Sequence, residues 1–242
     1  MLKKSIPFLL LLFAFKTIQG QELTATKLLD RSIAYHDPEG NWKQFQSILH
    51  INLEMPDRPT RKSEVYLNLP KQVFGLKTIQ DTITTYRKLE NGKCSFSLNG
   101  KTELDSTEIK KHRADCERTT MYRNYYTYLY GLPMKLKDPG TIIDPKVEKR
   151  EFKGKEYLVL RATYDKNVGT DEWYFYFDPE TYALKVYQFY KDKTKNDGEY
   201  ILLTDELETN EIKLPKTRVW YYNNNDGYLG TDDLEKVVDI NK

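Results

Sequence analysis

Hydrophobic positions follow two different rhythms along the 242-residue chain. Residues 22–36 place apolar side chains three or four positions apart, which is the spacing of an amphipathic helix. Residues 44–54 alternate apolar and polar side chains instead, as a half-buried strand does. The turn-forming cluster 36–40 separates the two segments. The chain therefore opens with a predicted helix followed by a predicted strand.

Short alternating runs bounded by turn residues continue to the carboxy terminus. The further predicted strands are 61–69, 72–78, 82–90, 93–98, 101–104, 147–153, 157–164, 172–177, 184–190, 199–207, 212–214, 216–222 and 229–240. Asn-Gly pairs at 91–92 and 99–100 supply the positive φ angles of tight hairpins, which predicts a three-stranded antiparallel meander over residues 82–104. The later strands follow one another without a helix between them, which predicts one large curved sheet.

A helical segment interrupts the strands near the middle of the chain. Asp105 and Glu108 resemble a capping box and predict a helix that starts near Ser106. This helix either continues to Gly131 or breaks near Arg123 into a second short helix. We therefore predict a mainly β fold of the α+β class. Its large curved antiparallel sheet, or incomplete barrel, is closed by the N-terminal and central helices.

The stretch 171–190 carries aromatic residues on two predicted strands that meet at the turn 178–179. With a loop over 179–182 and no bulge, the predicted cross-strand pairs are Phe177 with Leu184, Phe175 with Val186 and Trp173 with Gln188. One face of this hairpin then holds Trp173, Phe175, Phe177, Leu184 and Val186. The other face holds Tyr174, Tyr176, Lys185, Tyr187 and Phe189.

Neither face of this hairpin has the composition of a surface that faces water. Leaving four aromatic side chains wet would forgo several kcal/mol at roughly 25 cal/mol per Å². Either helices and other parts of the chain cover both faces, or one face lines a concave apolar cavity for a lipid-like ligand. The apolar and aromatic residues of both faces are the candidate ligand-binding residues.

The first twenty residues have the layout of a secretory signal peptide. Lys3 and Lys4 form the positive end, residues 6–15 are mainly apolar, and residues 18–20 resemble a cleavage site. We expect cleavage after Gly20 and a periplasmic or secreted product, with an uncleaved anchor as the alternative. No later stretch approaches the 18 or so apolar residues that a spanning helix requires. Residues 21–242 contain no linker or repeat and are expected to form one β-rich domain.

Charge and composition narrow the classes of partner. Removing the signal peptide removes Lys3, Lys4 and Lys16 and no acid, so the formal charge of +2 becomes −1. A nearly neutral chain with interspersed signs gives no reason to expect nucleic acid as a partner. The 19 tyrosines and 10 phenylalanines favour sheet over helix.

The two cysteines, Cys94 and Cys116, lie in a predicted strand and in the predicted central helix. In an exported protein two cysteines most often pair. Closing a loop of about twenty residues would stabilise the fold by about 3 kcal/mol. The alternative is a buried free thiol beside the helix.

Candidate catalytic and metal-binding residues are few. The three histidines, His36, His50 and His112, include no pair with the i, i+4 spacing of a helical metal site. His36 with Asp37 could form a base and its orienting carboxylate, but we favour an Asp37 that bonds its own loop. Nucleophile-elbow, P-loop and dinucleotide-binding motifs are not found in the sequence. We expect no catalytic residue, no metal and no cofactor.

Two polar clusters leave a choice between function and packing. The paired acids at 205–206 and 232–233 could bind a cation or do acid-base work, but we favour solvated strand ends or a helix start. Arg123 and Asn124 open a run of tyrosines and could form a binding rim or the outer part of a packed helix. We favour packing.

The turn in Phe177-Asp178-Pro179-Glu180-Thr181 is similar to the Asp-Pro-x-Thr turn of periplasmic lipoprotein carriers of the LolA and LolB type. Leu214-Pro215, followed by the segment 218–220, resembles their carboxy-terminal strands, and the order of helices and strands agrees. This resemblance implies an incomplete barrel closed by helices around an apolar cavity for acyl chains. It transfers no binding residue one to one.

A second resemblance covers nearly the whole mature chain. The segments 35–42, 130–134 and 173–190 look like a group of uncharacterised exported bacterial proteins, a domain of unknown function. That group implies no established activity.

These observations lead to one functional hypothesis and its alternatives. We expect a non-catalytic exported domain that binds a lipid or a lipidated protein, with peripheral membrane contact and oligomeric state left open. A glycan-binding or structural envelope module that uses Trp42, Trp173 and Trp220 is the alternative from a different class. An unrecognised hydrolase is a further one. A sugar platform should be exposed and flat, whereas a lipid cavity should be concave.

Overall fold

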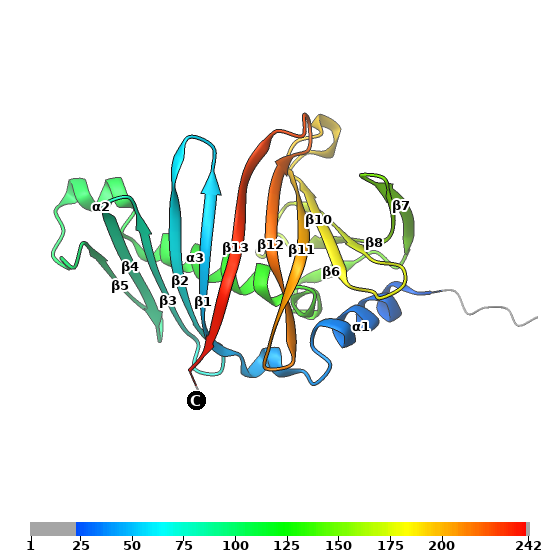
Figure 1. Ribbon diagram of the computed structural model, residues 1–242, viewed down its shortest axis with the longest axis horizontal. Helices are drawn as coiled ribbons and strands as arrows, with labels where there is room; N and C mark the ends of the chain where they lie inside the picture. Colours follow the sequence, from blue (N-terminus) through cyan, green and yellow to red (C-terminus); the bar gives the residue numbers. More distant parts are fainter. Residues whose placement is uncertain (1–22, 241–242) are drawn as a thin grey trace, which may run out of the picture.

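The computed structural model describes residues 23–240 as one large sheet with helices on its inner side (Figure 1). The predicted signal peptide lies outside the described residues. The helices are α1 (Ala25–His36), α2 (Ser106–His112) and α3 (Cys116–Gly131), with 3-10 helices η1 (Asn41–Gln44), η2 (Met134–Lys137) and η3 (Lys193–Lys195). The strands are β1 (Gln46–Met55), β2 (Arg58–Asn68), β3 (Val73–Gln80), β4 (Ile83–Glu90), β5 (Lys93–Leu98), β6 (Thr141–Ile143), β7 (Glu148–Phe152), β8 (Lys155–Tyr164), β9 (Glu172–Phe177), β10 (Leu184–Tyr190), β11 (Glu199–Thr209), β12 (Ile212–Tyr222) and β13 (Tyr228–Asp239).

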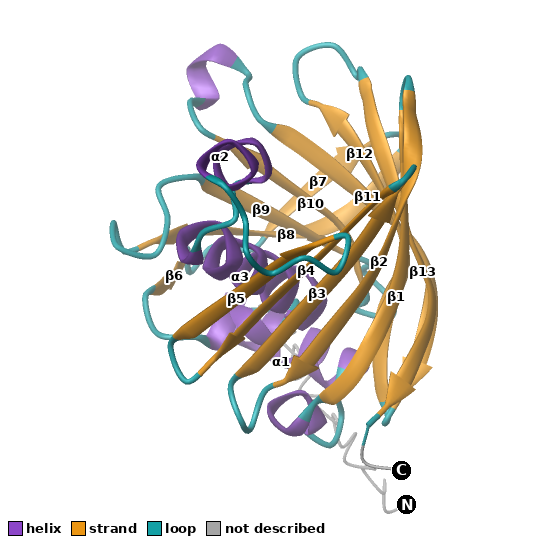
Figure 2. Cartoon of the chain, turned by 90° about the vertical axis from the view of Figure 1, so that its left-hand side faces the viewer, coloured by secondary structure: helices purple, strands orange, loops and turns teal. Residues whose placement is uncertain are grey.

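The sheet joins the two ends of the chain. Its strand order is β5-β4-β3-β2-β1-β13-β12-β11-β10-β9-β8-β6, and β7 pairs with β8 off this path. Strand β1 therefore pairs with β13 in antiparallel fashion. The sheet curves around the helices and stays open, because β5 and β6 end it as separate edges (Figure 2). The predicted large curved antiparallel sheet is confirmed.

Two apolar clusters fill the space between the sheet and the helices. The first joins α1, the end of α3 and η2 to strands β8 to β11, with Phe175 and Phe177 among its buried members. The second joins η1 and α3 to strands β1 to β4, β12 and β13, with Phe45 and Phe74 among its buried members. Helix α3 contributes to both clusters, so it lies along the middle of the inner face (Figure 2).

The amino-terminal helix begins and ends close to its predicted positions. Thr24 caps α1 by accepting a hydrogen bond from the Lys27 amide at 3.3 Å. Leu28 and Leu29 are buried against the first apolar cluster. The periodic apolar stripe of the sequence is therefore the stripe that packs against the sheet.

The meander that precedes α2 is shorter than predicted. Strands β4 and β5 pair as expected, but residues 101–104 form no strand and only an isolated bridge joins Leu98 to Lys101. The prediction of a third strand is wrong here because the chain turns directly into α2, which leaves β5 as an edge. The capping box is confirmed, since the Asp105 side chain accepts from the Glu108 amide at 2.9 Å and the Glu108 side chain accepts from the Asp105 amide at 3.0 Å.

The central helix breaks earlier than predicted. Arg113, with φ of 47°, ends α2, and Asp115 caps α3 by accepting from the Arg118 amide at 2.6 Å. No break occurs at Arg123, which lies within α3. Farther along the chain, the predicted strands 212–214 and 216–222 form the single strand β12.

A disulfide joins Cys94 on β5 to Cys116 at the start of α3. The two cysteines therefore form a disulfide and are not buried free thiols. The bond attaches the amino-terminal end of α3 to the edge of the sheet.

Candidate functional site

The aromatic hairpin β9–β10 has an altered register. Phe177 pairs with Leu184 as predicted, but the register shifts by one residue at Lys185. Beyond this bulge the pairs are Val186 with Tyr176, Tyr187 with Phe175, Gln188 with Tyr174 and Phe189 with Trp173. The other two predicted pairs, Phe175 with Val186 and Trp173 with Gln188, are therefore wrong. A bulge adds one residue to one strand, so each later side chain of β10 points to the opposite face.

Other parts of the chain cover both faces of this hairpin. The inner face, packed against α1, α3 and η2, holds Trp173, Phe175, Phe177, Leu184, Tyr187 and Phe189. The outer face, packed against β7 and β8, holds Tyr174, Tyr176 and Val186. The predicted separation of the three residues Trp173, Phe175 and Phe177 from Tyr174 and Tyr176 is confirmed. Val186, Tyr187 and Phe189 lie on the faces opposite to those predicted, because of the bulge.

Most of the candidate hairpin residues serve as core. Seven of the nine are buried, and Trp173 and Phe189 are half-buried. On the outer face, Phe152 of β7 lies 5.1 Å from the ring of Tyr176, and the Arg150 guanidinium lies 4.3 Å from the ring of Tyr174. The residues of this hairpin that a ligand could reach are therefore on the inner face.

A continuous row of aromatic rings runs along the inner face from the hairpin to α3. Trp173 stacks on Phe189 with 4.8 Å between ring centroids, and Tyr187 lies 6.2 Å from Trp173 and 6.4 Å from Trp220. Trp220 stacks on Tyr125 of α3 at 6.3 Å. All of these residues except Tyr187 are half-buried. We refer to these five residues as the aromatic row.

Two tyrosines of α3 at the aromatic row are largely shielded from water. Burial raises the pKa of the Tyr125 phenol well above its usual value, although its side chain keeps contact with solvent. The same holds for Tyr128, whose ring lies 5.6 Å from Trp173 and whose hydroxyl bonds Tyr164. Both tyrosines are therefore largely covered by protein and keep a small contact with solvent.

The three tryptophans do not form a flat exposed platform. Trp42 is 5% exposed and packs against Gly131, where an added Cβ would lie 2.7 Å from the Trp42 ring. Trp173 and Trp220 are half-buried within the aromatic row. This geometry differs from the one expected of a sugar-stacking surface.

Charged side chains lie beside the aromatic row on the central strands. The cross-strand register places Arg61 opposite Leu53, Leu53 opposite Asp232, and Asp232 opposite Arg218, on β2, β1, β13 and β12 in turn. Neighbouring strands are about 4.8 Å apart, so Asp232 and Arg218 are direct neighbours and Arg61 lies two strands from Asp232. We refer to Arg61, Arg218 and Asp232 as the arginine cluster. Charged residues are rarely buried without close partners, which makes this cluster the second part of the site.

Arg218 is the most deeply buried member of the arginine cluster, at 1% exposed. Its guanidinium donates to the carbonyl oxygens of Pro215 and Leu129, each at 3.3 Å, and lies 3.9 Å from the ring centroid of Tyr130. These contacts attach the end of α3 to the sheet. Carbonyl dipoles and a ring face stabilise a buried cation without neutralising it.

Asp232 lies between the two arginines. It is 9% exposed, and its carboxylate accepts a hydrogen bond from Trp220 Nε1 at 3.0 Å. Burial raises the pKa of the Asp232 carboxyl, while the charges of Arg218 and Arg61 act in the opposite direction. The expectation of a solvated strand end is wrong for Asp232. This residue lies inside β13, which continues to Asp239, and its side chain is buried.

Arg61 is half-buried at the edge of the same cluster. Its Nη2 donates to the Tyr126 hydroxyl over 3.5 Å, and its Nε is buried without a hydrogen-bond partner. Tyr130 Oη is a second buried polar atom in this region without a partner among residues 23–240. Buried donors are ordinarily hydrogen-bonded, so these two atoms distinguish the arginine cluster from an ordinary core.

His36 and Asp37 do not form a catalytic pair. His36 Nδ1 lies 2.8 Å from the Lys213 carbonyl oxygen, and Nε2 accepts from the Leu184 amide at 3.0 Å. Asp37 instead accepts from the amides of its own loop, those of Asn41 at 2.7 Å and Trp42 at 3.0 Å. The predicted loop role of Asp37 is confirmed.

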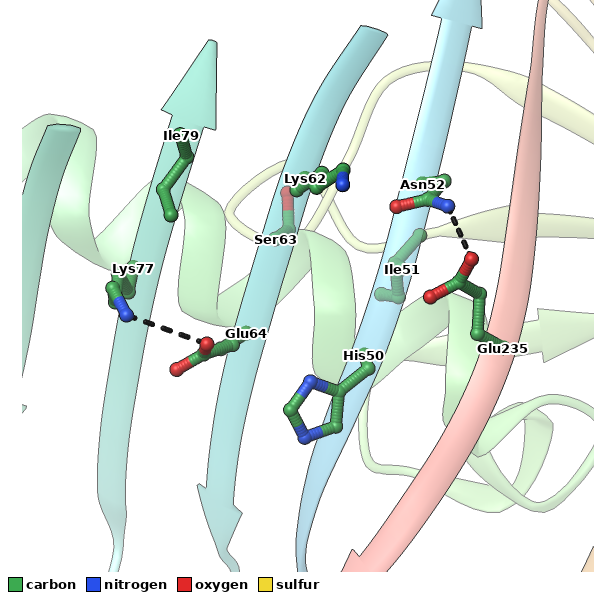
Figure 3. A pocket seen from close by; sticks show the side chains of 9 residues that line it. All are labelled: His50, Ile51, Asn52, Lys62, Ser63, Glu64, Lys77, Ile79 and Glu235. Carbon is green, nitrogen blue, oxygen red and sulfur yellow. Dashed lines mark hydrogen bonds and ion pairs between the residues drawn. The ribbon is translucent and has the colours of Figure 1, made fainter. Parts of the chain in front are cut away.

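Three surface depressions are lined by other residues. One of about 110 Å³ lies on the outer face over β1, β2, β3 and β13, with α3 behind the sheet (Figure 3). Three of its charged side chains are already engaged, as Glu64 pairs with Lys77 and Asn52 bonds Glu235 (Figure 3). A second, of about 270 Å³, lies beside η1. The third, of about 320 Å³, lies between α3 and the β2–β3 turn.

Arg123 and Asn124 line the third depression. Arg123 Nε donates to the Asn124 side chain at 3.0 Å, and both residues lie on the solvent side of α3. They therefore form part of a rim.

Two further observations concern chemistry and membranes. Among residues 23–240, no three His, Cys, Asp or Glu side chains gather closely enough to hold a metal ion. No helix formed by these residues combines the length and the apolar character needed to cross a bilayer.

Sequence reasoning did not identify the arginine cluster. A weak signal exists for Arg61. It is an even number of residues from Val65 and Leu67 on the same strand, so its side chain points to the same, apolar face of the sheet. For Arg218, Pro215 three residues earlier on the same strand obscures the alternation. The proximity of Arg61 to Asp232 depends on the pairing of β1 with β13, which local pattern does not contain.

Comparison with known proteins gives a family and a fold. The sequence profile described as "Family of unknown function (DUF6503)" matches residues 3–236. No curated protein matches the chain.

Solved structures resemble the chain over most of its length. A LolA superfamily protein from Nitrosomonas europaea has a TM-score of 0.52 at 11% identity, covering 90% of this chain and 94% of that one. A Vibrio parahaemolyticus domain, provisionally named for outer membrane lipoprotein sorting, has a TM-score of 0.50 at 12% identity, covering 87% and 90%. A DUF1329 family protein from Desulfovibrio piger has a TM-score of 0.50 at 9% identity, covering 90% and 94%. At these identities the likeness concerns the fold, which is LolA-like.

Proposed function

The chain belongs to the DUF6503 family, and from its LolA-like fold and inner face we propose that it is a non-catalytic exported domain that binds an apolar or lipidated ligand. The ligand is a lipid or the acyl chains of a lipidated protein. Residues 1–20 would direct the chain to the periplasm or beyond. The proposal places the ligand on the inner face of the sheet, beside α3.

The aromatic row is the observation that carries this proposal. Its rings are contiguous, four of the five residues keep contact with solvent, and they lie on the inner side of a curved sheet (Figure 2). Apolar surface that stays partly wet gains roughly 25 cal/mol per Å² when a ligand covers it. An acyl chain matches such a surface because it is apolar and adapts its shape to a curved wall.

We expect the protein to retain lipid when it is purified from its native compartment without detergent. Solvent extraction and mass spectrometry would identify the lipid, and the emptied protein should bind the neutral fluorescent probe N-phenyl-1-naphthylamine. Trp173→Ala should weaken probe binding by about tenfold, because covering one large aromatic ring contributes on the order of 1.5 to 3 kcal/mol. Tyr222→Ala is the matched control, since Tyr222 is 45% exposed and lies outside the aromatic row.

Three results would overturn the proposal. The first is the absence of both extractable lipid and probe binding. The second is saturable binding of a glycan that Trp173→Ala abolishes, which would favour the sugar-binding alternative. Turnover of an ester or phosphate substrate would favour a hydrolase.

A further inference from the structure

We propose that the ligand carries an anionic head group, a carboxylate or a phosphate, and that Arg61 contacts this head at the arginine cluster. The inference rests on the proposed function, because it assigns the polar end of the same ligand. The apolar end would lie on the aromatic row.

The charge balance of the arginine cluster is the first argument. Arginine keeps its proton in proteins, so two guanidinium groups face one carboxylate and leave one positive charge uncompensated. Among the described residues no carboxylate lies within ion-pair distance, 4.0 Å, of Arg61 or Arg218. Arg61 is half-buried, so water compensates its charge only in part and an opposite charge stabilises it further. An anion is therefore the chemical complement of this site.

The unused donors are the second argument. Arg61 makes one long hydrogen bond, to Tyr126, which leaves most of its planar set of N–H groups free. The Nε of Arg61 and the hydroxyl group of Tyr130 are buried without a partner among residues 23–240. Carboxylate and phosphate oxygens accept from such donors, and bonds to a charged acceptor are about twice as strong as neutral ones.

The position of Trp220 is the third argument. Its indole nitrogen donates to Asp232 at 3.0 Å, and its ring stacks on Tyr125 at 6.3 Å. The arginine cluster and the aromatic row therefore meet at this side chain. A molecule that lies along the row places its polar end at the cluster.

Accessibility separates the two arginines. Arg218 is 1% exposed and its guanidinium already bonds two backbone carbonyl groups. Arg61 is half-buried and bonds no carbonyl group. Arg61 is thus the group that a ligand reaches. Arg218 does not contact the ligand, but its positive charge in the interior attracts the anionic head group.

Four amphiphiles with one common twelve-carbon chain test the inference. Dodecanoate, dodecyl phosphate, dodecanol and dodecyltrimethylammonium would each displace N-phenyl-1-naphthylamine from the full exported chain, below their micelle-forming concentrations. We expect at least one of the two anions to bind about tenfold or more tightly than dodecanol, and the cation to bind least. The order of dodecanoate and dodecyl phosphate shows which head group the site prefers.

Arg61→Met keeps the length of the side chain and removes its charge. We expect it to reduce the affinity for the preferred anion by about tenfold or more and to leave dodecanol binding unchanged. The variant should also fold, since replacing a buried charge by an apolar side chain is often neutral or stabilising. Arg58→Met is the matched control, because Arg58 is exposed on the same strand, three residues away.

The outcomes separate this inference from the proposed function. If the protein binds neither the probe nor any of the four amphiphiles, the proposed function fails. If dodecanol or the cation binds as tightly as both anions, or if Arg61→Met weakens all four equally, the protein still binds apolar ligands and the head-group inference is wrong.

Discussion

His36 joins three elements of the molecule through its two ring nitrogens. It ends α1, and it bonds the carbonyl group of Lys213 on β12 and the amide of Leu184 on β10. Since a carbonyl group only accepts, Nδ1 carries the hydrogen and Nε2 is the acceptor. Burial lowers the pKa of His36, and the bond to the Lys213 carbonyl opposes this effect. A proton on Nε2 would face the Leu184 N–H, so the folded state requires neutral His36.

We predict that His36 makes the protein less stable in mild acid. Above about pH 6.5, His36 is neutral in both states and the stability is fully present. Below that pH, the unfolded chain takes up a proton that folded His36 does not, so the free energy of unfolding falls by up to about 1.4 kcal/mol per pH unit until the lower folded pKa is reached. Denaturant unfolding at a series of pH values between 7.5 and 5 would measure how the free energy of unfolding changes with pH.

Two variants separate His36 from the other titrating groups. His36→Gln should lower stability at every pH, because it disturbs two buried hydrogen bonds, and should flatten the slope. Leu28→Ala should lower stability and keep the slope, since Leu28 is buried on the same helix and takes up no proton. An unchanged slope in His36→Gln would contradict the assignment.

At the scale of elements, the disulfide connects the edge strand β5 to the start of α3. Within residues 23–240, strand β5 has a paired neighbour on one side only, β4. Helix α3 is the element that covers the inner face between the two apolar clusters. The bond between Cys94 and Cys116 closes a loop with a sequence separation of 22. It therefore fixes one end of the covering helix to the sheet.

Replacing both Cys94 and Cys116 by serine should lower the free energy of unfolding by about 3 kcal/mol, because the open loop gains entropy in the unfolded chain. Chemical denaturation would measure the change. Dithiothreitol should destabilise the parent protein by a similar amount and leave the double variant unaffected. Equal midpoints for the parent and the double variant would refute a stabilising role.

At the scale of the whole molecule, the pairing of β1 with β13 makes one sheet of two halves. Leu49 and Ile51 of β1 and Leu234 of β13 belong to the second apolar cluster, while the first lies beside β8 to β11. The arginine cluster lies across this seam, and α3 packs on both sides of it. A continuous sheet with a shared covering helix predicts cooperative unfolding.

We predict a single unfolding transition that both halves share. Phe175→Ala in the first apolar cluster and Leu49→Ala in the second are each buried at 0% exposed, and each should lower stability by about 3 kcal/mol. Circular dichroism and tryptophan fluorescence should give the same midpoint for each variant. Ile142→Ala, at 52% exposed, is the control and should change little. Two separate transitions would show that the halves are independent domains.

Local pattern determined most of the elements of this fold. Strands β9 and β10 agree with the predicted residues 172–177 and 184–190, and the capping box of α2 begins where Asp105 and Glu108 indicate. The reason is that strand alternation, turn residues and helix caps act over a few residues. The large curved sheet follows from the absence of helices between the later strands.

The tertiary structure decided the composition of the candidate site. The bulge at Lys185 moved Tyr187 and Phe189 to the inner face, and no residue type marks its position. The pairing of β1 with β13 brought Arg61 of β2 close to Asp232 and Arg218, which lie opposite each other on the consecutive strands β12 and β13. Such contacts depend on which strands meet and in what register, and that depends on packing over the whole sheet rather than on neighbouring residues.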